Sequence, residues 1–332
     1  MLLEANGVTS SCNVHNRGSS TATHLIVLAH GLMGSCTDLL YLSSLLEKDS
    51  SAVILRSKAN EVTKSFGGIG VGGANLANEI KEVINEHPGL QSISFVGNSL
   101  GGMYSRYAAF LLFDEKSKKL GGLSPRYFMT IATPHLGVRD FTYFDDIGLP
   151  PPDSLKHLAS RLLLRTGRDL FLTDCNRDAN TYSDDCLVYR MATSEEFIQP
   201  LRSFKNRRLY ANLHFDSVVP CGTAAILSKE ECGRVRALYS TRYNEIHSYT
   251  DSARVIDSAE QSGSDALAAM IAGLNSLQWD KKLVSFRAFL GILPLSHNKL
   301  AALVKEPTWF FSLFNFNEGA FVMQDAADYL LS

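Results

Sequence analysis

One serine of the chain lies in a pattern typical of nucleophilic catalysis. The segment GNSLG (97–101) matches G-x-S-x-G, in which small residues two positions from the serine permit a sharp turn. The apolar run SISFVG (92–97) before it predicts a buried strand, and LGGMYSRYAAFLLF (100–113) after it predicts a helix. A serine at such a strand–turn–helix junction exposes its hydroxyl above the sheet. Ser99 is therefore the candidate nucleophile.

A second segment indicates where an oxyanion would be stabilised. AHGLMGS (29–35) follows a predicted strand, and a His-Gly loop after an early strand can supply one backbone N–H to an oxyanion. The helix after Ser99 directs the positive end of its dipole, and further N–H groups, at the same place. The candidate donors are the amides of Leu32 and Leu100. We interpret His30 as bracing the loop and not as a general base.

A serine hydroxyl becomes a good nucleophile when a histidine takes its proton, and that histidine needs an orienting carboxylate. In enzymes with this kind of turn the acid follows the serine in the chain, and the histidine follows the acid. RLYANLHFD (208–216) predicts a strand with Asp216 at its carboxyl end, so Asp216 is the favoured acid. Asp251 and Asp257 are the alternatives, and neither follows a predicted strand.

Three histidines beyond residue 200 could act as the base. His214 falls inside the strand that is predicted before Asp216, and His247 has no apolar run directly before it. His297 follows the apolar run LVSFRAFL (283–290) and a short loop, which is where a last strand should deliver a base. Position in the chain thus favours His297 over His247.

Strands and helices alternate over the first 134 residues. Predicted strands at 24–31, 51–57, 92–97 and 126–134 are separated by helical patterns, with the glycine-rich segment GGIGVGG (67–73) interpreted as a flexible loop before a helix. Such alternation is typical of a doubly wound, mostly parallel sheet. The prediction is a single α/β domain over residues 1–332.

The alternation breaks after residue 138. Residues 138–205 are richer in polar and turn residues and mostly helical in their periodicity, which predicts a cap or lid inserted in the domain. Strand patterns return at 207–220 and 283–290, and the last dozen residues predict a closing helix.

Composition excludes several classes of protein. The formal net charge of −2 gives no overall field for nucleic acid, and no apolar run reaches the roughly 18 residues that a membrane span needs. Six cysteines without metal-site spacing favour free thiols in a reducing compartment, although Cys175 and Cys186 are close enough in sequence to pair. We expect a cytoplasmic protein without a signal peptide.

Several segments together resemble one known family. VLAHGLMGS, GGIGVGGANLANEI, SFVGNSLGGMYSRYA, IATPHLG, TGRDLFLTD, FKNRRLYANLHFDSVVP, LNSLQW and LSHNKL resemble, in order, segments of the putative serine esterase, lipase-like family of α/β-hydrolases. The resemblance implies an α/β-hydrolase fold with Ser99 as nucleophile, Asp216 as acid and His297 as base. It also implies hydrolysis of acyl esters, in particular of lipids, with no metal and no organic cofactor.

Two other functions fit the same residues. An acyltransferase would use the same three side chains with an alcohol in place of water, and a non-catalytic lipid-binding module would share the scaffold. For a lipid substrate, the segments FTYF (141–144), LASRLLL (158–164) and WFFSLFNF (309–316) are candidates to line an acyl pocket or to contact a membrane or lipid-droplet surface. Peripheral membrane association is therefore the second expectation for location.

Overall fold

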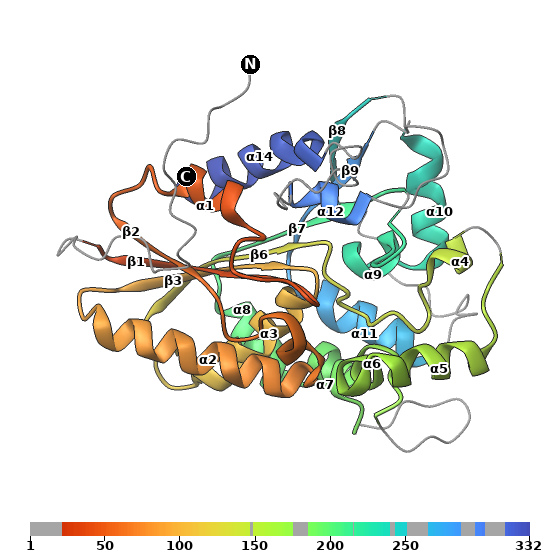
Figure 1. The fold of residues 1–332 in the computed structure, drawn as a ribbon, viewed down its shortest axis with the longest axis horizontal. Coiled ribbons are helices and arrows are strands. Elements are labelled where there is room, and N and C mark those ends of the chain that lie inside the picture. The colour runs from red at the N-terminus through yellow and green to blue at the C-terminus, as the bar shows by residue number, and fades with distance from the viewer. Residues whose placement is uncertain are drawn as a thin grey trace.

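The computed structural model describes residues 22–146, 149–174, 185–214, 216–239, 243–250, 265–286, 296–302 and 316–332. Within these residues a seven-stranded sheet has the order β2-β1-β3-β6-β7-β9-β8 (Figure 1). Its strands are β1 (His24–Ala29), β2 (Ala52–Arg56), β3 (Ser92–Asn98), β6 (Ser124–Ile131), β7 (Asn206–Asn212), β8 (Glu245–Tyr249) and β9 (Asp280–Ser285). All pairs are parallel except β8 with β9. The predicted mostly parallel sheet is confirmed.

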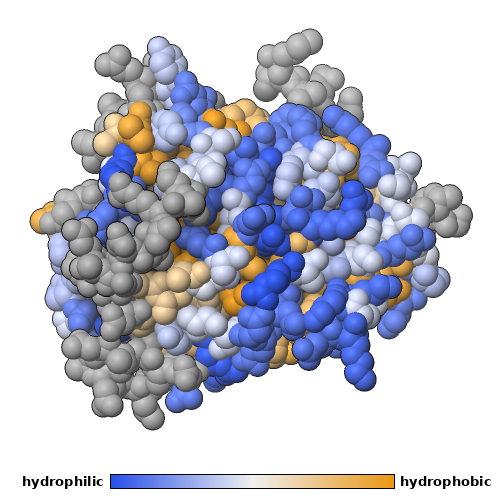
Figure 2. Space-filling model, turned by 180° about the vertical axis from the view of Figure 1, so that it is seen from behind, coloured by the Kyte–Doolittle hydropathy of each residue, from blue (hydrophilic) through white to orange (hydrophobic). Residues whose placement is uncertain are grey.

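The strands are buried on both faces because helices cover both sides of the sheet. Leu25 and Val27 of β1 point into one apolar cluster, and Ile26 and Leu28 point into the other. One side is covered by α2 (Ile69–Glu86), α3 (Leu100–Leu112), α8 (Glu195–Arg202) and α11 (Asp265–Asn275), and the other by α1 (Leu40–Leu46) and α14 (Ala320–Leu331) (Figure 1). This double cover explains the continuous apolar runs in the sequence. The outer surface of these layers is mainly hydrophilic on the side shown in Figure 2.

The predicted helical insertion lies between β6 and β7. Its described helices are α4 (Tyr143–Asp146), α5 (Asp153–Leu162), α6 (Leu164–Leu170), α7 (Leu187–Thr193) and α8. The helices α4 to α7 gather at one end of the sheet, whereas α8 packs on α3 (Figure 1). The ring centroids of Phe110 and Phe197 are 4.4 Å apart in that packing. The last helix of the insertion thus joins the layer that covers the sheet, and a separate cap over 138–205 stays a prediction.

The remaining elements are short. They are the hairpin β4 (Phe113–Asp114) and β5 (Lys119–Leu120), the helices α9 (Cys221–Ala225), α10 (Lys229–Leu238) and α12 (Ser296–Leu300), and the 3₁₀ turns η1 (Val62–Phe66) and η2 (Phe316–Gly319). Among the described residues, none of the helices combines the length and the apolar character needed to cross a bilayer.

The order of the strands creates a topological switch point at the carboxyl ends of β1 and β3. β1 and β3 are neighbours, but the chain leaves β1 toward β2 on one side and leaves β3 toward β6 on the other. Ligands in open α/β sheets bind outside the carboxyl ends of the strands at such a switch point. The His-Gly loop follows β1 and Ser99 follows β3, so both candidate segments meet there.

The glycine-rich segment 67–73 differs from its prediction as a loop. α2 begins at Ile69, so most of the segment is helical. A Cβ atom at Gly72 would lie 2.1 Å from the ring of Tyr104, and one at Gly73 would lie 2.5 Å from Cβ of Tyr107. The glycines therefore let α2 approach α3 closely, which is a long-range packing demand that local propensity does not reveal.

Two strand boundaries also differ from the prediction. β7 ends at Asn212, so His214 lies in a bend after the strand and not inside it. β9 ends at Ser285, and residues 287–295 lie outside the described part of the chain. The aromatic segment 309–315 lies outside it as well.

The prediction of free thiols is wrong for two cysteines. Cys36 and Cys186 are disulfide-bonded, whereas Cys221 and Cys232 are buried thiols. Spacing that argues against a metal site does not exclude disulfides, so the cysteines no longer support a reducing compartment.

Two buried side chains tie the insertion to the core. The Asp169 carboxylate in α6 accepts a hydrogen bond from the first backbone N–H of α2, at Ile69, over 2.7 Å. Arg106 in α3 donates to the carbonyl oxygens of His135, over 3.0 Å, and of Met191 in α7, over 2.5 Å. Burial raises the pKa of Asp169 to about 6, against the opposing hydrogen bond from Ile69.

The pKa of Asp169 predicts a pH dependence of stability. Since its folded-state value exceeds its ordinary value, the protonated group stabilises the fold below about pH 4, and this contribution is lost as the pH rises through about 6. Asp169→Asn removes the titration and keeps an acceptor for Ile69. We expect the unfolding free energy of the variant, measured relative to that of the parent at the same pH, to rise by about 2–3 kcal/mol when the pH is raised from 4 to 7.

Urea unfolding at several pH values measures this difference. Asp153→Asn, at the exposed start of α5, is the matched control and should follow the parent. A constant difference between Asp169→Asn and the parent at every pH would contradict the prediction.

Candidate active site

Ser99 sits on the tight turn between β3 and α3. Its backbone angles, φ of 53° and ψ of −126°, lie in a region that residues other than glycine rarely adopt. The Ser99 backbone N–H donates to the carbonyl oxygen of Ile131, 2.7 Å away, and the Thr133 hydroxyl donates to the Ser99 carbonyl oxygen over 3.0 Å. These contacts with the end of β6 hold the turn in its unusual conformation.

The glycines around Ser99 are required by close approach. A Cβ atom at Gly97 would lie 2.3 Å from Cα of Gly102, and one at Gly101 would lie 2.2 Å from the Ala29 carbonyl oxygen. No real Cβ atom tolerates such distances, so the turn can pack against the end of β1 only with glycine at these positions. The pattern G-x-S-x-G thus reflects backbone contacts on both sides of Ser99.

The structure brings together the three predicted side chains. His297 Nε2 lies 3.0 Å from Ser99 Oγ, and His297 Nδ1 lies 3.0 Å from Oδ2 of Asp216. His297 belongs to the short helix α12, and Asp216 follows the end of β7 by four residues. A hydroxyl, an imidazole and a carboxylate therefore form one hydrogen-bonded chain across three separate elements.

Asp216 is buried and held in its ionised form. It accepts hydrogen bonds from the Asn212 side chain (2.6 Å) and from the backbone N–H groups of Val218 (3.0 Å) and Val219 (2.8 Å). Burial alone would raise the pKa of Asp216. The charge and hydrogen bond of His297, with the bonds from Val219 and Asn212, outweigh burial and hold the pKa below its ordinary value. Asp216 is thus a negative charge beside the imidazole at neutral pH.

The other candidates lie elsewhere. His247 is in β8, where its ring stacks on Tyr239 with centroids 3.9 Å apart and its Nε2 lies 3.0 Å from Ser285 Oγ. Asp251 and Asp257 fall outside the described residues. The structure therefore pairs Ser99 with His297 and not with His247.

The His-Gly loop lies against Ser99. A Cβ atom at Gly31 would lie 2.8 Å from Cβ of Ser99 and 3.3 Å from its Oγ. His30 is buried with Nδ1 3.0 Å from the Gly31 carbonyl oxygen, which is the bracing contact expected for it. Leu32 directly follows Gly31, and Leu100 is the first residue of α3, where a backbone N–H has no partner inside the helix. Their roles as oxyanion donors stay a prediction.

Sequence reasoning missed the residues that hold Ser99 and Asp216 in place. Asn212 ends β7 and donates to Asp216, while Thr133 binds the backbone of the Ser99 turn. Asn212 is the last residue of β7, and Thr133 comes shortly after β6, so both lie at the carboxyl end of a strand. A polar residue at the carboxyl end of a predicted strand could have identified them from the sequence. Among the described residues, no group of three or more His, Cys, Asp or Glu is arranged to hold a metal ion.

Comparison with known families agrees with this geometry. Residues 19–230 match the model of the family described as "Putative serine esterase". The chain belongs to this family. The order of its sheet and the strand–turn–helix at Ser99 give it the α/β-hydrolase fold that the resemblance implied.

The matched relatives of this serine esterase family are longer proteins. "Putative lipase YDL109C" of Saccharomyces cerevisiae is 29% identical over 216 residues, which are 63% of this chain and 31% of that protein. "Putative lipase C4A8.10" of Schizosaccharomyces pombe is 30% identical over 217 residues, which are 62% of this chain and 26% of that protein. The match thus spans about a third or less of these relatives.

Two of the solved structures that align with the chain are an esterase and a lipase. Carboxyl esterase 2 of Tuber melanosporum aligns with 91% of this chain and 78% of its own, at 14% identity and a TM-score of 0.42. The Bacillus licheniformis lipase BlEst2 aligns with 60% of this chain and 69% of its own, at 16% identity and a TM-score of 0.35.

The backbone conformation of Ser99 predicts an unusual order of stability. Ser99→Gly removes the side chain that opposes a positive φ, whereas Ser99→Ala keeps a Cβ atom there. The relief is worth about 1–3 kcal/mol and exceeds the entropy that glycine adds to the unfolded chain, about 0.4–1 kcal/mol. Ser99→Gly should therefore be more stable than Ser99→Ala by about 1 kcal/mol.

Thermal or urea unfolding of the two variants tests this order. The same pair at Ser105, inside α3, is the control, and there glycine should be the less stable variant by about 1 kcal/mol. If alanine is also the more stable residue at position 99, the turn is not strained as described.

Proposed function

We propose that the protein hydrolyses carboxylic esters through an acyl-enzyme formed on Ser99, with His297 as general base and Asp216 as the acid that orients it. The observation that carries the proposal is the hydrogen-bonded chain from Ser99 Oγ through both ring nitrogens of His297 to Asp216. Membership of the serine esterase family supports the same chemistry.

The first half of the reaction forms the ester on Ser99. His297 Nε2 takes the hydroxyl proton as Oγ attacks the substrate carbonyl carbon. The imidazolium that results is stabilised by Asp216, whose carboxylate is ionised and receives the Nδ1–H. His297 then gives the proton to the departing alcohol, and the acyl group stays on Ser99.

The second half releases the acid. Water replaces the alcohol, and His297 removes a proton from it as the water oxygen attacks the acyl carbonyl carbon. His297 then gives this proton to Ser99 Oγ as the bond between Oγ and the acyl carbon breaks, and the carboxylic acid leaves. The oxyanion of each tetrahedral intermediate receives hydrogen bonds from the amides of Leu32 and Leu100 in the proposed mechanism. Such donors contribute about 3–4 kcal/mol each in related sites.

A lipid acyl ester is the proposed class of substrate. The curated relatives carry the name putative lipase, and the insertion lies at the end of the sheet where β1 and β3 end (Figure 1). Insertions at that end commonly cover acyl groups because ligands of α/β sheets bind there.

Labelling with a fluorophosphonate tests the three roles. The parent and His247→Ala should be labelled, because both keep the hydrogen-bonded chain. Ser99→Ala should not be labelled, and His297→Ala and Asp216→Asn should react far more slowly, by about 10⁴-fold for a lost carboxylate in a triad of this kind. Labelling that persists in Ser99→Ala would overturn the assignment of the nucleophile.

A series of nitrophenyl esters tests the substrate class. Each methylene that enters an apolar site contributes about 0.8 kcal/mol, so kcat/KM should rise from acetate toward longer acyl chains. The measurement is kcat/KM for each ester below its aggregation limit. Highest activity on acetate would contradict a lipid substrate while leaving the catalytic roles intact.

A further inference from the structure

The helix α5 has its apolar side exposed. Leu155, Leu158 and Leu162 follow a spacing of three and four residues and so lie on one face, which we call the leucine face. Their side chains are 49%, 54% and 72% exposed. The fully buried residue of the same helix is Ser160. This is the reverse of a helix that packs its apolar stripe on a core.

Two further leucines close to α5 in the sequence are also exposed. Leu164, which begins α6, is 60% exposed, and Leu149, shortly before α5, is 67% exposed. Single exposed leucines are ordinary on soluble proteins, but a contiguous set on one helix marks a surface that contacts something apolar.

Basic residues flank this face. Lys156 and Arg161 lie on α5 itself, and Arg165 and Arg168 follow in α6. Over α5 and α6 together, residues 153–170, four lysines and arginines stand against two aspartates, of which Asp169 is buried and Asp153 is exposed. A helix with leucines on one side and lysine or arginine beside them is suited to lie in the plane of a lipid surface that carries negative charge.

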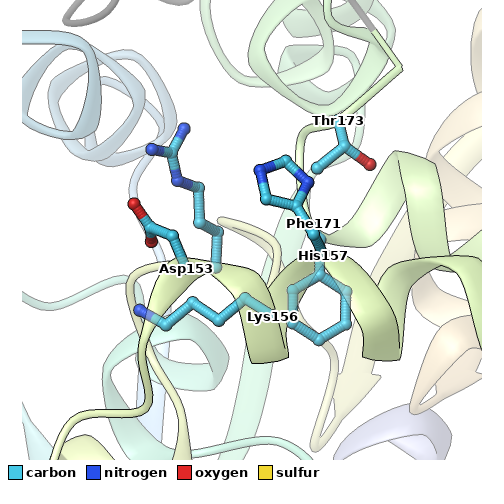
Figure 3. Close-up of a pocket in the computed structure, with 6 residues that line it drawn as sticks. Asp153, Lys156, His157, Phe171 and Thr173 are labelled. Carbon is cyan, nitrogen blue, oxygen red and sulfur yellow. The ribbon is translucent and has the colours of Figure 1, made fainter.

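A small pocket adjoins the same helix. It is lined by Arg139, Asp153, Lys156, His157, Phe171 and Thr173, with about 180 Å³ of free space that is partly open to solvent. Figure 3 shows His157 and Thr173 on one side of the pocket and Asp153 and Lys156 on the other.

We propose that α5 docks the protein on an anionic phospholipid surface, with the leucine face among the acyl chains and the flanking cations at the phosphates. The inference does not depend on catalysis, because binding is measured on a variant without the Ser99 hydroxyl. If a second copy of the chain or another protein covered the leucine face, binding would depend on the leucines but not on anionic lipid. Varying the lipid composition therefore distinguishes a lipid surface from a protein partner.

The orientation fits the position of the active site. α5 lies at the end of the sheet where β1 and β3 end, and Ser99 and the His-Gly loop follow those two strands (Figure 1). Docking through α5 therefore brings the same end of the molecule toward the lipid.

Sedimentation with vesicles of phosphatidylcholine, with and without phosphatidylserine, tests the proposal on the full chain carrying Ser99→Ala. The protein should bind the vesicles that contain phosphatidylserine, and added salt should weaken binding. Leu158→Ser and Leu162→Ser should each lower the partition coefficient about tenfold, the factor that about 1.4 kcal/mol of lost apolar burial gives. Lys156→Gln and Arg161→Gln should lower it several-fold with phosphatidylserine and leave phosphatidylcholine vesicles unaffected.

Exposed positions away from α5 provide the controls. Leu331→Ser in α14, where the leucine is 41% exposed, and Lys116→Gln in an exposed turn should bind as the parent does. Unfolding temperatures of all variants should match the parent, because the substituted side chains are exposed. Equal binding of the leucine variants and the parent would overturn the proposal. So would a change from dimer to monomer in the leucine variants without any vesicle binding by the parent, which would assign the face to a second copy.

Discussion

The site depends on how closely the backbone around Ser99 approaches the ends of the neighbouring strands. At Gly97 and Gly101 the distance available is too short for a single Cβ atom, and one of the atoms in the way is the Ala29 carbonyl oxygen. The turn is therefore fixed between β1, β3 and the start of α3. This turn holds Ser99 Oγ 3.0 Å from the imidazole Nε2 of His297, with the His-Gly loop packed against the same residue.

The negative charge of Asp216 is stabilised first by His297 and then by amide groups at and after the end of β7. Besides the contact with His297, the buried carboxylate accepts hydrogen bonds from the Asn212 side chain and from two backbone N–H groups. None of these three donors, all within the described part of the chain, carries a positive charge that would oppose a proton on His297. The carboxylate thus stays ionised beside the imidazole.

The parts of this site that were predictable are those fixed by local sequence. The segment 97–101 carries its own strand, turn and helix signals, and Asp216 stands close after a strand. For His297 the residues gave only a preference, because α12 is short and its partner lies 198 residues away in sequence. The helical start of α2 was missed for the same reason: the need for glycine at positions 72 and 73 comes from Tyr104 and Tyr107 on another helix.

The Asp169 carboxylate at the first turn of α2 has a consequence for the insertion of this protein. The first backbone N–H of this core helix donates a hydrogen bond to a carboxylate that lies 100 residues further along the chain, and the buried Arg106 of α3 donates to the insertion as well. Excising the segment between β6 and β7, or replacing it by that of another hydrolase, would leave the start of α2 without its carboxylate and Arg106 without an acceptor on α7. The insertion therefore cannot be exchanged as a unit without disturbing the core. Substitutions at its outward-facing residues should be tolerated better than substitutions at the few residues that contact the core.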